Sequence, residues 1–340
     1  MVDPVLAGDV GGTKTLLRLC GPGGASLLQR RFESAKQASL TAMVQAFLDE
    51  AARAGHPRPR IAAFGVAGPV VDGVSKTTNL PWRLDEGDIA QACGLAAVRL
   101  MNDFEATAYG VLDLPAASLS TLQLGDPAHG GNVAVIGAGT GLGEALLVPI
   151  LDRSSGTIAS WHVVATEGGH ADFAPRDDLE IELLRWLRTR HGHVSWERVV
   201  SGQGIVAVYS FLRDTGVVKE SAAVAAEIAA GDPGAVIGAH ALAGTDALCM
   251  KTIDVFVGAY GSEAGNLALK GLATGGVFLT GGIAPKLLPK LADGAFLRSY
   301  RDKGRLSSVV ERAPVHVVLD QEVPLRGAAY VAARMASGAL

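Results

Sequence analysis

The N-terminal hexapeptide Gly8-Asp9-Val10-Gly11-Gly12-Thr13 has the residue types of a phosphate-binding turn. Apolar residues precede it at 5–7 and follow it at 15–20, which predicts two strands joined by a tight glycine turn. Adjacent glycines lack Cβ atoms, so their N–H groups can approach an anion closely, and Thr13 adds a hydroxyl donor. Asp9 is a candidate to hold Mg²⁺ through water, because Mg²⁺ prefers oxygen ligands and keeps much of its hydration shell. The alternative is an ordinary hairpin turn.

The same arrangement occurs again near the middle of the chain. A strand predicted at 133–136 leads into the segment GAGTGLG at 137–143, and an outgoing strand follows at 145–148. Two such turns facing each other could hold the two ends of a triphosphate, which one glycine turn alone does not indicate. The chain has no Walker loop of the G-x-x-x-x-G-K-[ST] type. It also lacks a dinucleotide-binding fingerprint, because the first glycines lie between two strands and do not open a helix.

Asn102 and Asp103 follow a short apolar strand predicted at 97–101. A carboxylate at the end of a strand can accept a proton from a substrate hydroxyl, and an amide beside it offers both a donor and an acceptor. One of the two side chains could instead cap the helix that we expect from Phe104 onward. The two roles are compatible, because a cap holds its residue in a fixed place.

Glu167 and His170 flank the pair Gly168-Gly169. The glycines would let the backbone close round a small ligand such as a sugar ring, with both polar side chains directed at it. The alternative is a polar turn around an ordinary histidine. Glu197, in Ser-Trp-Glu-Arg at 195–198, is a weaker candidate, since a glutamate in a first helical turn is also favoured by the helix dipole.

Thr280-Gly281-Gly282 follows a buried strand predicted at 277–279. Glycines at this point would leave room for a flat ring or a ribose, although a tight turn between a strand and a helix is an equally good interpretation. Pro285 is expected at the first position of the following helix, where a missing N–H costs little.

Periodicity predicts the elements that must position these residues. Apolar residues from Leu40 to Ala51 recur on one helical face, with Ser39 as the N-cap and Gly55 as the stop. The apolar stretch 235–269 is interrupted by charged residues and is expected to be one buried helix or a helix pair. The remaining predicted elements are strands at 27–32, 61–67, 70–74, 157–164 and 315–319, and helices at 178–190, 196–200, 202–213, 221–230 and 324–335.

Composition excludes several classes of protein. The chain has 340 residues, 49% hydrophobic and only 19% charged, with a net charge of −4 and no basic block, so a nucleic-acid footprint is not expected. We expect no membrane span, because no run of about 18 apolar residues occurs, and no signal peptide. Three widely spaced cysteines argue against disulfides or a zinc site and favour a reducing cytoplasm. The high apolar content suggests a buried subunit interface.

In order and spacing, these segments resemble the bacterial glucokinase family of the hexokinase–actin-like superfamily along essentially the whole chain. The matching segments are GDVGGT at 8–13, MNDFEATAYG at 101–110, GAGTGLG at 137–143, EGGH with DFAP from 167, HVSWERVVSG at 193–202, GGVFLTGGIAPKLL at 275–288 and DKGR at 302–305. Each is weak alone, whereas the series is specific. The resemblance implies a zinc-free glucokinase (ATP:D-hexose 6-phosphotransferase) that uses ATP to phosphorylate D-glucose at its 6-hydroxyl, as in glycolysis.

The resemblance also implies roles for single residues. Asp103 would be the catalytic base, and Asp9 a water-mediated ligand of Mg²⁺. The sugar hydroxyls would be held by Asn102, Asp103, Glu167, His170 and Glu197. The first phosphate turn would comprise Gly8, Asp9, Gly11, Gly12 and Thr13, and the second Gly139, Thr140 and Gly141, with Gly281 and Gly282 near the adenosine. The implied cofactors are ATP and Mg²⁺, the implied partner is a hexose, and the family implies a cytoplasmic homodimer.

The implied fold is α/β, with two actin-like (ribonuclease H-like) domains around a deep cleft and a hinge between them. We expect a small domain at 1–113 plus 320–340, which carries the first phosphate turn and Asp103. A large domain at 114–319 would carry the second turn and the sugar and adenosine contacts. The break in pattern at Leu114-Pro115 is consistent with the first boundary.

Three departures leave the sugar open. Lys14 stands where this family often has asparagine, and it resembles the repressor–kinase branch of sugar kinases, whose cysteine-rich zinc motif does not occur here. The segments 65–69 and 79–82, near the expected sugar pocket, also depart from the closest pattern. A kinase for another hexose or an amino sugar, such as mannose, fructose or N-acetylglucosamine, is therefore an alternative.

Two alternatives come from other classes of protein. A catalytically weak sugar-sensing regulator would share this scaffold, but a turn that starts at Gly8 leaves no room before it for a DNA-binding extension, and the acidic residues are all present. An actin-like structural ATPase would not need Asn102-Asp103 together with the 167–170 segment.

Overall fold

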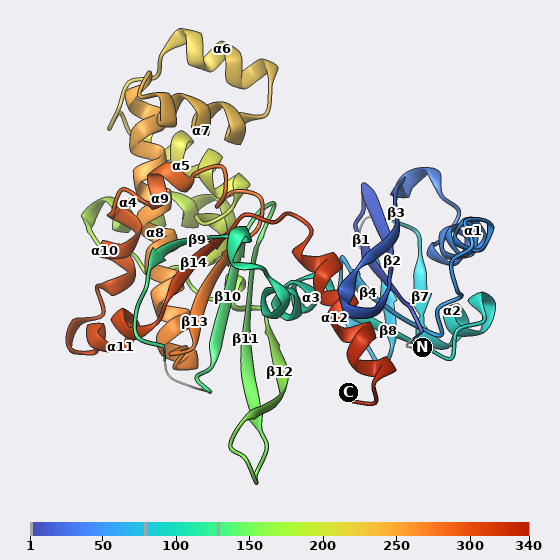
Figure 1. Cartoon of the computed structure of the whole chain (residues 1–340). Coiled ribbons are helices and arrows are strands. Elements are labelled where there is room, and N and C mark those ends of the chain that lie inside the picture. The colour runs from blue at the N-terminus through green and yellow to red at the C-terminus, as the bar shows by residue number, and fades with distance from the viewer. Residues whose placement is uncertain (1–2, 78–79, 128–129, 340) are drawn as a thin grey trace. The chain divides into compact units, whose positions relative to one another are not determined.

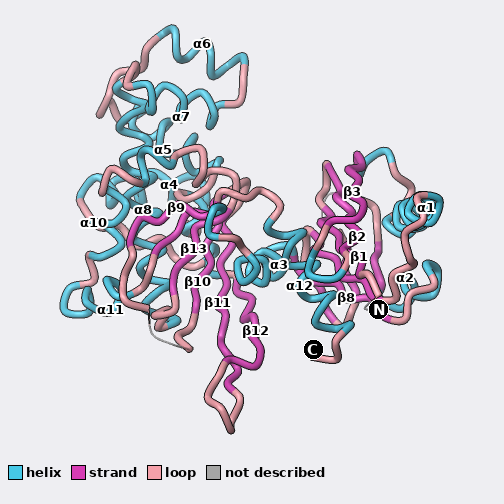
Figure 2. The backbone as a smooth tube through the Cα atoms, in the orientation of Figure 1, coloured by secondary structure: helices cyan, strands magenta, loops and turns pink. Residues whose placement is uncertain are grey.

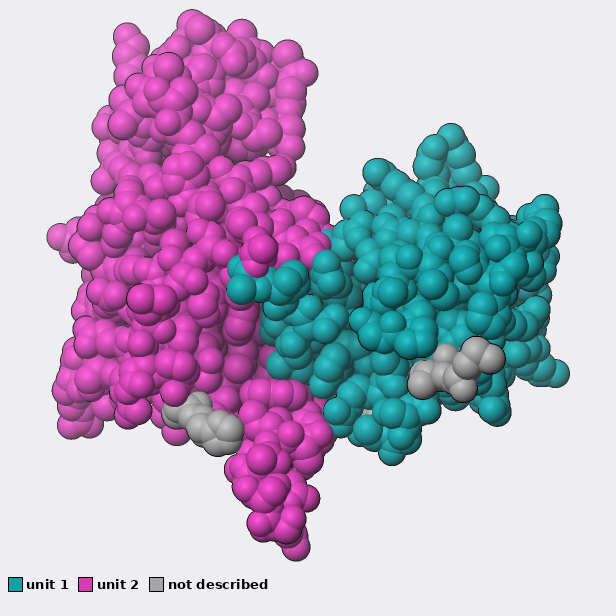
Figure 3. All heavy atoms as spheres, in the orientation of Figure 1, with its two compact units in different colours: residues 1–116, 322–340 teal, residues 117–321 magenta. Residues whose placement is uncertain are grey.

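The computed structural model describes residues 3–77, 80–127 and 130–339 (Figure 1). Contacts within the chain divide it into unit 1, residues 1–116 with 322–340, and unit 2, residues 117–321 (Figure 3). The sequence predicts a small domain at 1–113 with 320–340 and a large domain at 114–319, and this division into domains stays a prediction. Asn79, in one of the segments that depart from the family pattern, lies outside the described residues.

Unit 1 contains a five-stranded sheet in the order β3-β2-β1-β4-β8. Strand β1 pairs antiparallel with β2 and parallel with β4, and β4 pairs parallel with β8. The strands are β1 (Val5–Val10), β2 (Lys14–Cys20), β3 (Ser26–Glu33), β4 (Ile61–Val66) and β8 (Ala97–Asn102). Because β1, β4 and β8 are parallel, their carboxyl ends meet at one edge of the sheet, where Asp9 and Asn102 were predicted to act.

Helices α1 (Leu40–Arg53) and α2 (Glu86–Cys93) cover one face of this sheet, and α3 (Asp103–Gly110) and α12 (Val323–Ala336) cover the other (Figure 1). The predicted apolar stripe of α1 is confirmed, because all six of its residues from Leu40 to Ala51 are buried. Its predicted N-cap is also confirmed, since Ser39 Oγ accepts a hydrogen bond from the Ala42 N–H at 3.1 Å. Local signals were therefore sufficient to define this helix.

The segment predicted as one strand at 70–74 is instead a small hairpin. Strands β5 (Val70–Val71) and β6 (Val74–Lys76) are joined by a turn in which Asp72 has a φ of 49°, and β7 (Arg83–Asp85) completes a three-stranded sheet. Asp and Gly tolerate this left-handed conformation, and an apolar run that contains them can reverse direction.

Helices α3 and α12 approach each other at backbone distance. A Cβ atom built on Gly327 would overlap the Ala106 carbonyl oxygen, and one built on Gly110 would overlap the Val323 carbonyl oxygen. Two glycines therefore allow the last helix of the chain to pack on the helix that begins at Asp103. Helix α12 also packs against β1 and β4, although it begins more than 200 residues after α3 in the sequence.

We expect Gly327→Ala to destabilise unit 1 by about 3 kcal/mol, because the new methyl group cannot enter the α3–α12 contact without shifting backbone. Gly87→Ala is the matched control in α2 of the same unit, where a Cβ would meet only Asp85 Oδ1 at 3.4 Å. The control should leave stability unchanged or raise it by up to about 1 kcal/mol. Urea unfolding followed by circular dichroism measures both, and equal midpoints for the two variants would contradict the close approach.

Unit 2 repeats the topology of unit 1 around a six-stranded sheet in the order β12-β11-β10-β13-β14-β9. Strand β10 pairs antiparallel with β11 and parallel with β13, as β1 does with β2 and β4, and β9 is an added edge strand. The strands are β9 (Leu119–Gln123), β10 (Val133–Ala138), β11 (Leu142–Leu151), β12 (Ile158–Thr166), β13 (Gly276–Thr280) and β14 (Val315–Val318). In Figure 2, β11 and β12 run on beyond their neighbours to a turn at 152–157.

The apolar stretch 235–269 forms the helix pair α7 (Pro233–Ala243) and α8 (Ala247–Gly271). Gly244, with a φ of 68°, ends α7, and Asp246 caps α8 through the Cys249 N–H at 2.8 Å. Among the described residues no helix is long and apolar enough to cross a membrane. The other helices of unit 2 are α4 (Asp178–His191), α5 (Gly202–Asp214), α6 (Ala222–Ala230), α9 (Leu288–Leu291), α10 (Ala295–Arg301) and α11 (Ser307–Arg312).

Pro285 was predicted at the first position of a helix, and this prediction was wrong. Residues 281–287 form a series of turns, and the short helix α9 begins only at Leu288, with Pro289 in its first turn. The reason is the Ile283 N–H, which donates to the Ala138 carbonyl oxygen at 3.3 Å and ties this segment to the end of β10. A contact between distant segments thus outweighed the local helix signal.

Helix α4 has Asp177 before its first residue and Glu180 three residues later, which is the residue pattern of a capping box. Asp177 does accept from the Glu180 N–H at 2.9 Å, but Glu180 Oε2 accepts from the Arg176 N–H at 2.8 Å. Glu180 also pairs with the Arg176 side chain and is buried, while Leu179 packs partly buried against the core. The helix predicted at 196–200 is shorter in the structure, where it is a single 3₁₀ turn at Trp196–Arg198.

Candidate active site

Three polar residues of unit 1 gather at the carboxyl edge of its sheet. The strand register pairs Asp9 with Gly65 and Gly65 with Met101, so Asp9 and the Asn102-Asp103 pair lie at the same level across β4. Their side chains are placed by rigid strands and by the start of α3. The structure therefore brings together the two acidic residues predicted for Mg²⁺ binding and for base catalysis.

Asn102 is the residue that caps α3. Its Oδ1 accepts from the Phe104 N–H at 2.8 Å and the Glu105 N–H at 3.4 Å, while its Nδ2 donates to the Gly68 carbonyl oxygen at 3.1 Å. The capping interpretation is thus correct for Asn102. Asp103 is the first residue of the helix, and its Oδ1 accepts from the Phe104 N–H at 2.9 Å. The carboxylate of Asp103 is held at a helix N-terminus, where the dipole favours its charged form.

The first glycine turn is held by hydrogen bonds that leave its outer side open. The Gly11 N–H donates to the Lys14 carbonyl oxygen at 3.0 Å, and Ser34 Oγ donates to the Gly11 carbonyl oxygen at 2.7 Å. Gly8 lies inside β1 and not in the turn, and a Cβ there would overlap Phe64 Cδ1. Core packing therefore accounts for the glycine at position 8, and Gly11, Gly12 and Thr13 form the turn itself.

The carboxyl group of Asp9 has a strongly raised pKa. Burial raises its pKa to about 6; nearby Lys14 opposes the shift, while Asp103 and Glu322 add to it. The charges of Asp103 and Glu322 thus act on Asp9, with Lys14 close to Asp9 and Arg18 paired with Glu322. Such a cluster has the charge and the oxygen donors to hold a divalent cation, which would relieve the repulsion.

Asp9→Asn should stabilise the ligand-free protein at neutral pH. Because the pKa of Asp9 is raised from 3.8 to about 6, its contribution to stability is present below pH 4 and is lost as the pH rises through 6. We therefore expect the variant to melt a few degrees above the parent chain at pH 7.5 and to match it near pH 4. Thermal unfolding at both pH values tests this, with the exposed Asp88→Asn as the control. A variant that melts at or below the parent temperature at pH 7.5 would contradict the repulsion.

The second glycine turn lies at the equivalent edge of unit 2. The Gly139 N–H donates to the Gly141 carbonyl oxygen at 2.9 Å, and the Gly202 N–H at the start of α5 donates to the Gly139 carbonyl oxygen at 2.8 Å. Gly281, with a φ of 83°, approaches so closely that a Cβ would overlap the Ala138 carbonyl oxygen. The predicted second phosphate turn and the predicted adenosine segment at 281–282 are therefore neighbours at the carboxyl ends of β10 and β13.

Glu167, His170 and Glu197 also lie together in unit 2. His170 Nδ1 is 3.7 Å from Glu167 Oε2, and His170 Nε2 is 3.8 Å from Glu197 Oε1. Gly168–His170 form one 3₁₀ turn, and the side chains of Glu167 and His170 are largely exposed. The structure thus places these three predicted sugar-binding side chains in one group with unused hydrogen-bonding capacity.

Glu197 also supports the second glycine turn. Its Oε2 accepts a hydrogen bond from the Leu142 N–H at 2.9 Å, immediately after Gly141, where a Cβ would overlap the same oxygen. This carboxylate therefore links the predicted sugar-binding group to the predicted phosphate turn. The sequence offered no sign of that link, since 55 residues separate the two partners.

Glu197→Ala should lower the stability of unit 2 by about 1–3 kcal/mol, because the Leu142 N–H is left without this acceptor. Glu197→Gln keeps an oxygen at that place and should lose less than half as much. Urea unfolding gives the two values, and Glu182→Gln serves as the control for loss of a surface charge. Equal losses for the alanine and glutamine variants would show that the hydrogen bond contributes nothing to stability.

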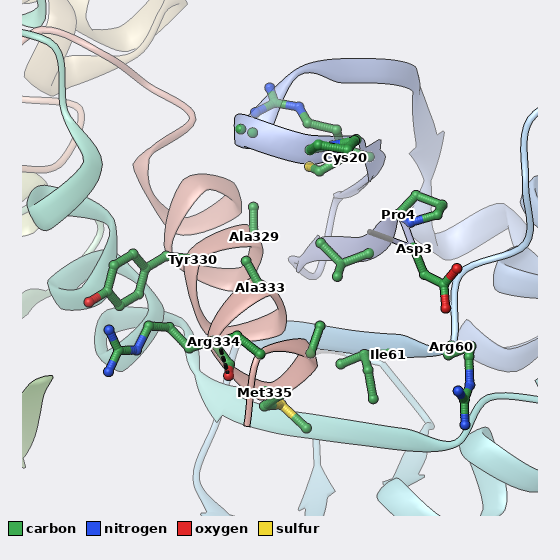
Figure 4. A pocket seen from close by; sticks show the side chains of 18 of the residues that line it. Asp3, Pro4, Cys20, Arg60, Ile61, Ala329, Tyr330, Ala333, Arg334 and Met335 are labelled. Carbon is green, nitrogen blue, oxygen red and sulfur yellow. Dashed lines mark hydrogen bonds between the residues drawn. The ribbon is translucent and has the colours of Figure 1, made fainter. Parts of the chain in front are cut away.

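A cavity of about 950 Å³ in unit 1 lies at the opposite edge of the sheet (Figure 4). Its lining includes Val5 and Ile61, which begin β1 and β4, together with Ala329 and Ala333 on α12. The glycine turn follows the other end of β1, and Asp103 follows the same end of the parallel strand β8. The cavity is therefore not part of the candidate active site.

Two supporting residues were missed from the sequence. Ser34, fully buried, holds the Gly11 carbonyl oxygen. Glu322, just before α12, accepts from Gln29 Nε2 at 2.9 Å, pairs with Arg18 and adds to the charge near Asp9. Nothing local distinguishes either residue, because each acts on a segment distant in the chain.

Two α/β units that share the order of five strands, with a glycine turn after β1 in one and after β10 in the other, define an actin-like fold. The Glucokinase family model matches residues 6–335. A glucokinase from Trichormus variabilis is 45% identical over 348 aligned residues, which cover 97% of this chain and 99% of that protein. A crystal structure of glucokinase from an Antarctic psychrotroph is 32% identical with a TM-score of 0.84, covering 98% of this chain and 100% of that one.

A ROK family glucokinase from Streptomyces griseus, solved in complex with glucose and AMPPNP, has the same fold at 23% identity. Its TM-score is 0.61, and the alignment covers 97% of this chain and 99% of that one. The chain belongs to the glucokinase family. The predictions of a glucokinase and of two actin-like α/β domains are thereby confirmed.

Proposed function

We propose that this chain transfers the γ-phosphoryl group of ATP to the 6-hydroxyl of D-glucose, with Asp103 as the base. The observation that carries the proposal is the position of Asp103 beside Asp9 at the carboxyl edge of the unit 1 sheet. Phosphoryl transfer depends on positioning and on charge neutralisation more than on covalent chemistry by the protein. A base fixed at a helix N-terminus and an acidic group suited to a cation meet both needs.

The residues of this edge fit Mg²⁺. Asp9 would hold the ion through water, and the carboxylates that raise its pKa supply the negative field that favours a cation. The ion would supply charge neutralisation at the phosphate oxygens. The N–H groups and the hydroxyl of the turn at Gly11, Gly12 and Thr13 would bind phosphate, as would those of the turn at Gly139, Thr140 and Gly141. Gly281 and Gly282 would leave room for the adenosine.

Glucose would be bound by polar side chains that are accessible and can form further hydrogen bonds. Glu167 and His170 are largely exposed, and Glu197 has its Oε1 directed at His170. Asn102 would add a contact from unit 1. The proton on the 6-hydroxyl would pass to the carboxylate of Asp103 as the phosphoryl group is transferred. The glucose and AMPPNP in the Streptomyces griseus structure support this choice of sugar and of nucleotide.

The proposal extends to cellular location and assembly. Cys20, Cys93 and Cys249 are buried free thiols, which favours a reducing cytoplasm. A homodimer is proposed from the family resemblance. Analytical ultracentrifugation of the purified chain would decide between a monomer and a dimer.

Asp103→Asn should reduce glucose-dependent ADP release from Mg-ATP by 10²–10⁴-fold with little change in melting temperature. The amide keeps an oxygen for the Phe104 N–H but cannot accept the hydroxyl proton. A coupled assay for ADP, run with glucose and a panel of other hexoses, measures the effect, and Asp88→Asn is the surface control.

Activity of Asp103→Asn within tenfold of the parent chain would refute the role of Asp103 as the base. ADP release with a higher kcat/KM for another sugar would show that this other sugar, and not glucose, is the preferred substrate. Absence of sugar-dependent release from the parent chain would refute the proposed function.

A further inference from the structure

Two buried glutamates lie beneath the turn that carries Glu167 and His170. Glu144 is on β11 and is 2% exposed, and Glu263 is on α8 and is 0% exposed. Both interrupt apolar segments, and the roles assigned to the active site use neither. Burying two acidic groups together is costly unless they share a proton or are neutralised.

The neighbours of the two carboxyl groups differ. Glu263 Oε2 accepts from Asn266 Nδ2 at 2.8 Å, and its Oε1 accepts from Lys270 Nζ at 3.3 Å. Glu144 Oε1 has no hydrogen-bond partner among the described residues, although it is buried. The charged form is therefore supported at Glu263 and not at Glu144. Two ionised carboxylates cannot hydrogen bond to each other, so a proton on Glu144 is what allows it to donate to Glu263.

The charged groups around the pair favour the same assignment. Burial raises the pKa of Glu144 to about 8, and the charge of Glu263 adds to the shift while Lys270 opposes it. Burial also raises the pKa of Glu263, against the opposing effects of Asn266, Lys270 and Lys303. The other titratable group that faces Glu144 is Tyr260 on α8, whose pKa burial raises above its usual range.

The carboxyl group of Glu144 is also the support on which the 167–170 turn rests. A Cβ on Gly168 would overlap Glu144 Oε2, so the two groups are in close contact. Thr166 Oγ1 donates to the Glu144 carbonyl oxygen at 2.9 Å and accepts from the Gly168 N–H at 3.1 Å. A change in the position of the Glu144 carboxyl group must therefore displace Gly168, which lies between Glu167 and His170.

We propose that Glu144 is a positioning residue that, in its neutral form, donates a hydrogen bond to Glu263 and holds the 167–170 turn in its sugar-binding conformation. Ionisation of Glu144 places two negative charges side by side, which pushes its carboxylate toward Gly168 and displaces Glu167 and His170. The sugar-binding part of this role rests on the function proposed above. The shared proton and its effect on stability do not.

The expected consequence is a loss of glucose affinity at alkaline pH. If only the neutral form binds well, KM for glucose rises about tenfold between pH 7 and pH 9 for a group that titrates near pH 8. The effect on kcat should be small over the same range, because the roles proposed for Asp103 and for the phosphate turns do not use the Glu144 carboxyl group. This split between KM and kcat distinguishes positioning of the sugar-binding turn from general unfolding.

Glu144→Gln is the direct test, because the amide has the same shape and cannot ionise. KM for glucose should vary less than threefold between pH 7 and pH 9 in this variant, while Glu182→Gln, a surface control on α4, should keep the tenfold rise. The proposal is overturned if Glu144→Gln and the parent chain show the same pH profile of KM.

A second measurement needs neither turnover nor a folded variant. Infrared spectroscopy of the parent chain in D₂O at pH 7 should show a protonated carboxyl band that disappears as the pH is raised to 9. In parallel, the melting temperature should fall over this range, because the stability contributed by a carboxyl group with a raised pKa is lost as the pH passes that pKa. Absence of the band at pH 7 overturns the proposal even if glucose is phosphorylated. If the band is present but no sugar is phosphorylated at any pH, the proton-sharing pair stands and the proposed function fails.

Discussion

Repulsion between carboxylates that the fold brings together is the constraint on which this structure depends. In unit 1 the parallel register of β1, β4 and β8 places Asp9 and Asp103 at one edge, with Glu322 nearby. In unit 2 the packing of α8 on the sheet encloses Glu144 with Glu263. Each cluster lowers the stability of the folded chain in the absence of a cation or a proton. Ionisable groups with such perturbed pKa values are concentrated at functional sites.

The two clusters are relieved in different ways because their surroundings differ. The edge that carries Asp9 adjoins the glycine turn at 11–13, where Thr13 is exposed, and a hydrated cation is the partner proposed for it. The Glu144–Glu263 pair is buried, with Glu144 on β11 against Gly168 of the 167–170 turn and Glu263 on α8, and we propose that a shared proton relieves it. In the proposed function the same kind of repulsion would favour a cation in unit 1, and in unit 2 a shared proton beneath the 167–170 turn.

Glycine makes these arrangements possible through close approach more than through unusual dihedral angles. Gly327 and Gly110 let α12, the last helix of the chain, pack closely on α3, the helix that begins at Asp103. Gly168 rests on Glu144, and Gly281 on the end of β10. Only Gly281 of these four has a positive φ. The glycines of the two turns stand out in the sequence as motifs, whereas Gly110 and Gly327 do not.

Local signals in the sequence were sufficient for the two strand–turn–strand units, the apolar stripe of α1 and its Ser39 cap, because these depend on neighbours within a few residues. The motif series was sufficient for the family. Tertiary structure decided that Asn102 is the residue that caps α3, that Pro285 starts no helix, that Glu197 reaches Leu142 and that Glu144 meets Glu263. Each of the last two contacts joins residues from different elements, and no periodicity or cap records which side chain will face which across a core.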